Sequence, residues 1–304
     1  MALSKAPIEN HIVVTSIPEL GSDVYTSVNP LGRQEGTKTV FGGFLISQAL
    51  LAASATVPDS FRPYSSQSTF TAAADGNEKI IYHVERVSDG RSFITRVVRA
   101  SQGTANIYTA MISFQSIATT RGNELQYGAP MIELDGGPED IDPSAMQNMQ
   151  SSLVNRSTPI MQQSIEDRPL DWRPHSLEVG DDPASFRFRA FVKSTPLSTK
   201  DTLTHLAALA YASDDLFFGV ALLANPVAVG RGWRNLASAA SLAHNVSFHD
   251  PDAKMDEWIV TERETSWGAM GRVVVHQKMW NWRTGNLILS GSQEALVRLH
   301  GSKI

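Results

Sequence analysis

The alternation of apolar and polar residues predicts a long buried helix near the start of the chain. From Thr39 to Pro58 the sequence reads TVFGGFLISQALLAASATVP, and after Gly43 it is apolar on nearly every face of a helix. A helix that is apolar all round is buried inside a protein rather than laid on its surface. Pro58 limits the helix, because the residue before a proline avoids helical geometry.

Several runs after this helix have the two-residue period of strands, as in HVERV and FITRVV. Asp89-Gly90 and Gln102-Gly103 separate such runs and predict tight hairpin turns. The expected strands are Tyr64 to Ala72, Lys79 to Val87, Ser92 to Ser101 and Ala105 to Ser116. A helix followed by antiparallel strands indicates an α+β fold.

The second half of the chain repeats this order. The elements expected there are a strand at Ser185 to Lys193, a helix at Asp201 to Asp214, and strands at Ser241 to His249, Glu257 to Glu264, Arg272 to Trp282 and Leu287 to Arg298. Matching residues also recur at a nearly constant separation, which is the mark of a tandem repeat. The matches are Phe70 with Phe248, Glu85-Arg86 with Glu262-Arg263, Arg96-Val97 with Arg272-Val273, and Gln115 with Gln293.

The stretch between the repeats differs in composition. Residues 118–181 contain several prolines, many polar residues and the patch MQNMQSSL. This stretch is too long for a structureless loop inside one compact domain. We therefore predict an N-terminal unit at residues 1–117, a linker with one or two short helices at 118–181, and a C-terminal unit at 182–304.

Composition and charge narrow the classes of function. The chain has 304 residues, of which 42% are apolar and 19% charged, as in ordinary globular proteins. Its net charge of −5 does not indicate binding to nucleic acid, which favours a positively charged surface. The sequence has no run of 18 apolar residues that would predict a membrane span. The chain has no cysteine, which excludes disulfides, thiolate metal sites and a cysteine nucleophile.

Five short sequence motifs, in their order along the chain, resemble those of the type II acyl-CoA thioesterase family. They are Val40-Phe41-Gly42-Gly43, Tyr82 to Gln115, Tyr211-Ala212-Ser213-Asp214, Ser241 to His249, and Ser292-Gln293-Glu294. Members of that family consist of two fused hot-dog units, each a long helix wrapped by an antiparallel sheet. The resemblance implies a tandem hot-dog fold, hydrolysis of an acyl-CoA, no cofactor and no metal, and a homo-oligomer.

The resemblance also implies a catalytic set. In the family, an Asp at the end of the second helix, a Ser or Thr opening the next strand and a Gln on the last strand bind and activate a water. The matching residues here are Asp214, Ser241 and Gln293. The sequence departs from the family pattern at Phe44, Ala243 and Ser247, where the family usually has Gln, Asp and Trp. These departures leave the acyl substrate open.

The chemistry of thioester hydrolysis suits these residue types. Only Asp214 of the three can accept a proton at neutral pH, and burial would raise its pKa from about 3.9 toward that of a useful base. Ser241 and Gln293 can hold the water by hydrogen bonds. Gly42 and Gly43 permit close approach of substrate and offer backbone N–H groups to an oxyanion. We expect Gly42, Gly43 and His244 to border the substrate.

Two other functions are compatible with the same fold. A hydratase or dehydratase acting on an enoyl or hydroxyacyl thioester would need His244 to reach Asp214. A non-catalytic acyl-CoA-binding protein would keep the fold without the chemistry. A metal site at His244 and His249 is not expected, because their spacing places them on opposite faces of a strand.

The chain ends in Ser302-Lys303-Ile304, which resembles the Ser-Lys-Leu address for peroxisomes. We therefore expect a peroxisomal protein that binds the peroxisomal import receptor through these residues. Without that address the expected location is the cytoplasm, because the N-terminus does not have the pattern of a secretion signal.

Overall fold

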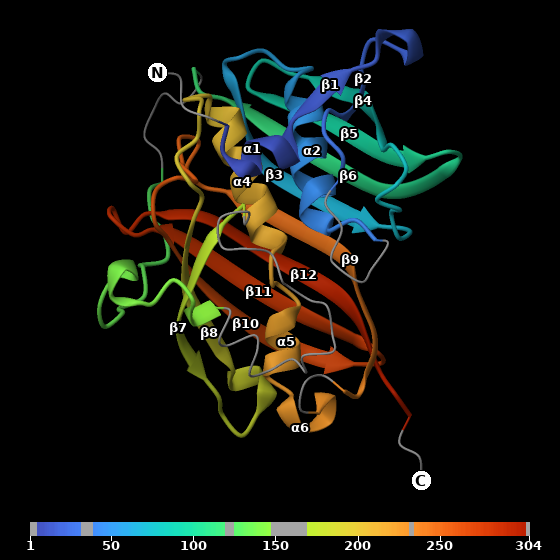
Figure 1. The fold of residues 1–304 in the computed structure, drawn as a ribbon. Helices are drawn as coiled ribbons and strands as arrows, with labels where there is room; N and C mark the ends of the chain where they lie inside the picture. The colour runs from blue at the N-terminus through green and yellow to red at the C-terminus, as the bar shows by residue number, and fades with distance from the viewer. Residues whose placement is uncertain (1–4, 32–38, 119–124, 147–168, 231–233, 302–304) are drawn as a thin grey trace.

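The computed structural model describes residues 5–31, 39–118, 125–146, 169–230 and 234–301. Within these residues the chain forms one antiparallel sheet of twelve strands that curves around helices (Figure 1). The strands are β1 (Val14–Ser16), β2 (Val24–Ser27), β3 (Phe61–Phe70), β4 (Ile81–Asp89), β5 (Phe93–Gln102), β6 (Ala105–Ser116), β7 (Asp171–Glu178), β8 (Arg187–Lys193), β9 (Leu236–Phe248), β10 (Ile259–Ala269), β11 (Arg272–Asn281) and β12 (Leu287–Leu299).

The sheet is two matching halves joined at a seam where β3 pairs with β9. The first half runs β1-β2-β4-β5-β6-β3, and the second half continues β9-β12-β11-β10-β8-β7. Each strand thus has a counterpart at the same distance from the seam. This symmetry confirms the predicted tandem hot-dog fold.

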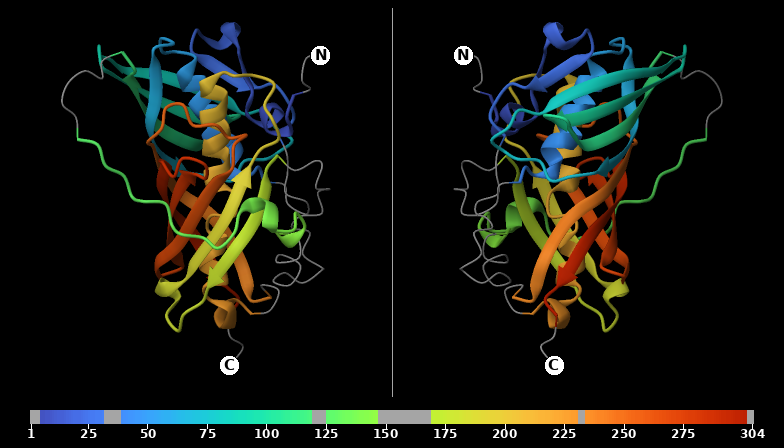
Figure 2. Two further views of the ribbon diagram at one scale, coloured as in Figure 1. Left: turned by 90° about the vertical axis from the view of Figure 1, so that its left-hand side faces the viewer. Right: turned by 90° about the vertical axis from the view of Figure 1, so that its right-hand side faces the viewer.

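Two helices occupy the inside of the curved sheet. They are α2 (Gly42–Ser54) and α4 (Thr202–Asp214), which pack against each other near the middle of the molecule (Figures 1 and 2). The carboxylate of Asp201 caps α4 by accepting hydrogen bonds from the backbone N–H groups of Leu203 and Thr204. The described residues also form the helices α1 (Pro7–Ile12), α5 (Gly219–Leu223) and α6 (Pro226–Val229) and the short 3-10 turns η1 (Pro18–Leu20), η2 (Pro138–Asp140) and η4 (Pro183–Ser185).

The segment Thr202–Leu223, which includes α4 and α5, is a long apolar helical part of the described chain. By length and composition it could cross a membrane. In the structure 72% of its most apolar window is buried, since the sheet wraps around it. Its apolar character is that of a core helix, which must be buried all round.

Each half buries an arginine against the C-terminal end of its central helix. Arg96 donates at 3.1 Å to the carbonyl of Thr56, two residues beyond the end of α2, and Arg263 donates at 3.2 Å to the Ala212 carbonyl in the last turn of α4. Both side chains are fully buried. The last carbonyls of a helix have no partner within it, and a buried cation satisfies them while complementing the negative end of the helix dipole.

Strand β7 lies within the stretch 118–181 that the sequence indicated as a linker. It pairs with β8 and forms the outer edge of the second half. Its sequence, DWRPHSLE, has no clear alternation, and its register shifts between Pro174 and Ser176. A proline without an N–H is tolerated at such an irregular edge position, but it hides the strand from pattern-based prediction.

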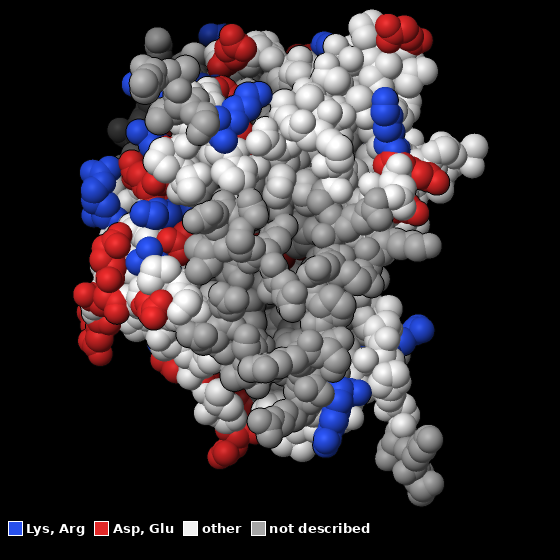
Figure 3. Space-filling model, viewed as in Figure 1, with Lys and Arg blue, Asp and Glu red and all other residues white. Residues whose placement is uncertain are grey.

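Charged side chains of both signs are interspersed along this edge. In Figure 3 red and blue atoms alternate beside the place that β7 occupies in Figure 1. Arg189 on β8 bonds to Glu178 on β7 and to Glu262 on β10, the latter at 2.7 Å. These pairs link three neighbouring strands, and charged edges also discourage pairing with foreign strands.

Candidate active site

The N-terminal end of α2 meets the C-terminal end of α4, and Asp214 lies at this junction. Asp214 is the last residue of α4 and is 4% exposed. A methyl group added at Gly42 would lie 2.6 Å from Asp214 Oδ2 and 2.9 Å from the Phe70 ring. Glycine is therefore the only residue that lets the α2 backbone approach the carboxylate so closely. The positive end of the α2 dipole faces this anion.

Ser241 reaches the same place through a bulge in β9. His244 pairs with Gln293 on β12, whereas Ser241 pairs with Ala295, so the register shifts between these two pairs. Residues three apart normally point to opposite faces of a strand. The extra residue of the bulge turns Ser241 to the inner face, where His244 and Gln293 also point.

Gln293 connects the other two predicted catalytic residues by hydrogen bonds. Its amide nitrogen donates to Asp214 Oδ1 at 2.5 Å and to Ser241 Oγ at 2.9 Å. The side chain is 1% exposed, and its Oε1 atom has no hydrogen-bond partner among the described residues. The structure therefore brings Asp214, Ser241 and Gln293 together. It leaves Gln293 Oε1 as a buried acceptor at the same site.

Asp214 has the electrostatics of a base that works near neutrality. Burial is the largest effect and raises its pKa from 3.8 to about 7, to which the negative charge of Asp215 adds. The Gln293 hydrogen bond, the Arg263 charge and the Gly43 backbone N–H oppose part of this rise in pKa. A carboxylate with such a pKa can take a proton from water far better than an ordinary surface Asp.

His244 is buried beside Gln293 but is turned toward α4. Its Nε2 lies 3.2 Å from Ser213 Oγ, and its ring packs edge-on against Phe217 with centroids 5.8 Å apart. Burial lowers its pKa to about 4, so the ring is neutral at physiological pH. These contacts fix the ring in the wall behind the site. Direct contact with substrate stays a prediction for this residue.

His249, directly after the end of β9, lies away from the site. His249 Nε2 is 2.9 Å from Ser290 Oγ, on an exposed part of the sheet. In the described parts of the chain, no three His, Cys, Asp or Glu side chains are grouped closely enough to hold a metal ion.

Two buried side chains behind the site were not singled out as site residues from the sequence. Arg263 donates to the backbone carbonyl of Asp215 and to Gln277 Oε1, and Gln277 Nε2 donates to the Ser213 carbonyl at 2.8 Å. This network holds the last turn of α4, and thus Asp214, against β10 and β11. In the sequence, Arg263 stands out only as part of the Glu-Arg pair that is repeated in the two halves.

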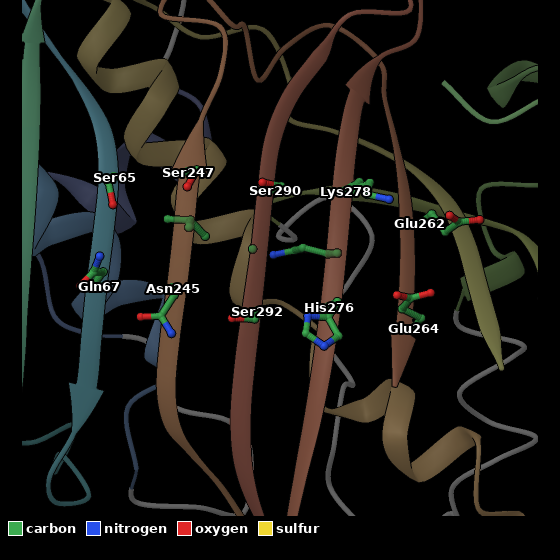
Figure 4. Close-up of a pocket in the computed structure, with 13 residues that line it drawn as sticks. Ser65, Gln67, Asn245, Ser247, Glu262, Glu264, His276, Lys278, Ser290 and Ser292 are labelled. Carbon is green, nitrogen blue, oxygen red and sulfur yellow. The ribbon is translucent and has the colours of Figure 1, made fainter. Parts of the chain in front are cut away.

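The outer face of the same strands carries a separate polar groove of about 440 Å³. Figure 4 shows Gln67, Asn245, Ser292, His276 and Glu264 among its lining residues, which come from five different strands of the sheet. Because neighbouring residues on a strand alternate between faces, Asn245 and Ser292 point away from the side occupied by His244 and Gln293. The groove and the Asp214 site are therefore on opposite sides of the sheet.

Family models cover both halves of the chain. A model described as the acyl-CoA thioesterase N-terminal domain matches residues 30–115, and one described as the C-terminal domain matches residues 138–297. The chain belongs to the acyl-CoA thioesterase family. The family resemblance read from the sequence words is thereby confirmed, and the family is one of thioester hydrolases.

Individual thioesterases are similar over most of their length. Acyl-coenzyme A thioesterase 8 of Mus musculus is 28% identical, with 95% of this chain and 89% of the relative covered. Acyl-CoA thioesterase 2 of Haemophilus influenzae is also 28% identical, with 86% and 89% covered. A peroxisomal acyl-coenzyme A thioester hydrolase of Saccharomyces cerevisiae is 34% identical over 46% of this chain and 40% of its own length.

Solved structures agree on the fold. An acyl-CoA thioesterase II from Mycobacterium marinum superposes with a TM-score of 0.73 at 23% identity, covering 98% of this chain and all of that one. A hot-dog protein of unknown function from Alicyclobacillus acidocaldarius has a TM-score of 0.72 at 13% identity, with 97% and 99% covered.

Proposed function

We propose that this protein hydrolyses a fatty or related acyl-CoA to the free acid and coenzyme A, with a water activated by Asp214. The observation that carries the proposal is the Gln293 amide, which bonds to both Asp214 and Ser241 and keeps its buried oxygen free. A water between these groups could donate one proton to Asp214 and one to Gln293 Oε1.

The proposed reaction proceeds by addition and elimination. The water oxygen forms a bond to the thioester carbonyl carbon while Asp214 accepts a proton from it. Ser241 and Gln293 hold the water in line for this attack. The carbon–sulfur bond then breaks, the electron pair leaves on sulfur, and the proton held by Asp214 passes to the thiolate. The products are the carboxylic acid and free coenzyme A.

Gly42 and Gly43 form the proposed substrate wall from the first half. Because Gly42 has no side chain, the backbone at the start of α2 lies directly beside the Asp214 carboxylate, and a thioester bound next to Asp214 would lie against this backbone. The Gly43 N–H is directed at Asp214, and so it steadies the base.

The geometry argues against the hydratase alternative. Such a reaction would use a histidine and the carboxylate in one pocket, whereas His244 Nε2 is engaged with Ser213 and lies in the wall of the site. Ser241 and Gln293 would have no role in hydration. A purely binding function would not need a buried carboxylate with a pKa of about 7.

Location and assembly are also proposed. Ser302, Lys303 and Ile304 lie outside the described residues, and we propose that they bind the peroxisomal import receptor. The yeast relative whose name places it in the peroxisome supports this location. We further propose a homo-oligomer, since the exposed outer face of the sheet offers a polar surface shared by both halves. Light scattering of the purified protein measures the oligomeric state.

The test of activity is release of free thiol from a panel of acyl-CoAs of different chain length. We expect release by the wild type and a loss of about 10² to 10⁴-fold in Asp214→Asn, which has no base. Asp201→Asn is the matched control at the other end of α4, because asparagine caps a helix as well as aspartate does. Hydration of an enoyl-CoA without thiol release would overturn the proposal.

A further inference from the structure

Tyr108 is a buried residue of the first half that lies on the wall of the proposed site. It is on β6, is fully buried, and pairs directly with Phe70 on β3. The two rings pack with centroids 5.1 Å apart. Phe70 is the same ring that lies against Gly42 at the start of α2. Tyr108, Phe70 and Gly42 are therefore consecutive parts of one wall facing Asp214.

The phenol of Tyr108 has no hydrogen-bond partner among the described residues. The neighbouring Ser68 hydroxyl donates to the His244 carbonyl at 2.7 Å, and its polar interaction with the phenol offsets part of the effect of burial on the pKa of Tyr108. A buried hydroxyl without a partner destabilises a protein by about 1 to 3 kcal/mol, and so its retention requires an explanation. Burial, aided by the nearby charge of Asp214, raises the pKa of this phenol above its usual value. Tyr108 therefore keeps its proton and remains a donor.

Thioester hydrolysis needs a hydrogen-bond donor for the oxyanion, and two candidate donors of the site are engaged elsewhere. The Gln293 amide nitrogen has two protons, and they point to Asp214 and Ser241. The Gly43 N–H is directed at Asp214. When the carbonyl oxygen of the thioester gains negative charge, it requires a donor that is already in position.

We propose that the hydroxyl of Tyr108 donates a hydrogen bond to the carbonyl oxygen of the bound thioester and stabilises the oxyanion. This inference rests on the proposed hydrolysis. The phenol proton stays on Tyr108 throughout, so no bond of the residue is made or broken. The site would then be composite, with its base in the second half and its oxyanion donor in the first.

Tyr108→Phe tests this role, because it removes the hydroxyl and keeps the ring. We expect kcat for acyl-CoA hydrolysis to fall on the order of 10²-fold, the effect of losing one oxyanion donor. KM is expected to change much less. The midpoint of the pH–rate profile should stay at that of the wild type, since Asp214 keeps all its partners. Tm should be unchanged or higher, because an unsatisfied buried hydroxyl is gone.

Tyr82→Phe is the matched control in the same half. Tyr82 is equally buried, but its hydroxyl donates to Gln48 Oε1 at 2.8 Å. Removing it leaves that buried oxygen without its donor, so we expect a lower Tm with kcat close to the wild-type value. The two variants should thus show opposite patterns of activity and stability.

Three results would overturn the role of Tyr108 in an active enzyme. They are wild-type kcat in Tyr108→Phe, a fall in kcat accompanied by a matching fall in Tm, or a shifted pH midpoint, which would assign the phenol to Asp214 instead. If the wild type releases no thiol from any acyl-CoA, the proposed hydrolysis fails first, and the inference fails with it.

Discussion

Ser241 faces Gln293 because strand β9 contains one residue more than its partner at this point. The pairing moves from Glu294 with Ala243 to Ala295 with Ser241, which leaves Leu242 without a partner. The bulge gives Ser241 Oγ its 2.9 Å contact with the Gln293 amide. Bulges commonly re-aim a side chain beside an active site. Here the bulge supplies the hydroxyl of the proposed water site.

The hydroxyl itself, rather than the size of the side chain, should matter at position 241. We expect Ser241→Ala to lower kcat about tenfold, the equivalent of one hydrogen bond, while Ser241→Thr keeps most of the activity. The thiol-release assay measures both. Ser238→Ala on the same strand, at an exposed position, is the control. Equal activity in Ser241→Ala and the wild type would remove Ser241 from the water site.

The pKa of Asp214 predicts how activity and stability depend on pH. The active form is the carboxylate, so kcat/KM should fall as pH drops through about 7. For stability the sign is opposite: the folded-state pKa is raised above the unfolded value, so the folded protein binds this proton more tightly. Asp214 therefore destabilises the fold progressively as pH rises from about 4 to about 7.

Asp214→Asn separates the two effects. We expect its Tm to exceed that of the wild type at pH 8, because the buried charge is gone, and the difference to shrink toward pH 4. Thermal melts over that range measure the difference, with Asp201→Asn at the other end of α4 as the control. A Tm difference that is constant with pH would contradict the raised pKa of Asp214.

Gly42 is expected to tolerate no side chain. In Gly42→Ala the new methyl would collide with Asp214 Oδ2 and the Phe70 ring, so α2 must shift. We expect a loss of about 1 to 3 kcal/mol in the free energy of unfolding, as for other overpacked sites, and loss of activity as well. Gly219→Ala is the control, since nothing lies within 4 Å of its added methyl. Alanine at a helical position should stabilise that variant slightly.

Arg263 is predicted to set both the stability of α4 and the pKa of its last residue. Arg263→Met leaves the Ala212 and Asp215 carbonyls without their buried donor, and we expect a loss of about 3 kcal/mol or more. It also removes a positive charge that lowers the pKa of Asp214, so the midpoint of the pH–rate profile should move to higher pH.

Arg96→Met is the matched control for this prediction. Arg96 holds the end of α2 in the first half as Arg263 holds α4 in the second. Its loss should lower Tm without moving the pH midpoint. A midpoint that moves equally in both variants would show that general destabilisation, not the charge of Arg263, is responsible.

The repeat match of Gln115 with Gln293 is wrong in register. Gln115 matches Gln293 by position along the chain, but Phe114 and Ser116 on either side of it are buried, whereas Gln115 is half-buried. Its side chain therefore points to the opposite face from that of Gln293. Bulges occur at different places in β3 and β9 and change which residues pair. A constant separation between matching residues in the sequence does not account for these bulges.

The sequence by itself determined the fold class, because apolar periodicity reports which elements must be buried. Both central helices and the long strands of the two halves lie close to their expected positions, whereas the irregular edge strand β7, the short N-terminal elements and the short helices α5 and α6 were not predicted. Asp214, Ser241 and Gln293 came from a family resemblance, which specifies residue types in order but no distances.

Only the tertiary structure decided how those residues meet. The bulge that turns Ser241 inward depends on the pairing of β9 with β12, and the raised pKa of Asp214 depends on burial between two helices from different halves. The wall of Gly42, Phe70 and Tyr108 opposite Asp214 joins residues far apart in the chain. Such contacts arise from packing across the seam, and local patterns of polarity do not record which distant residues will pack together.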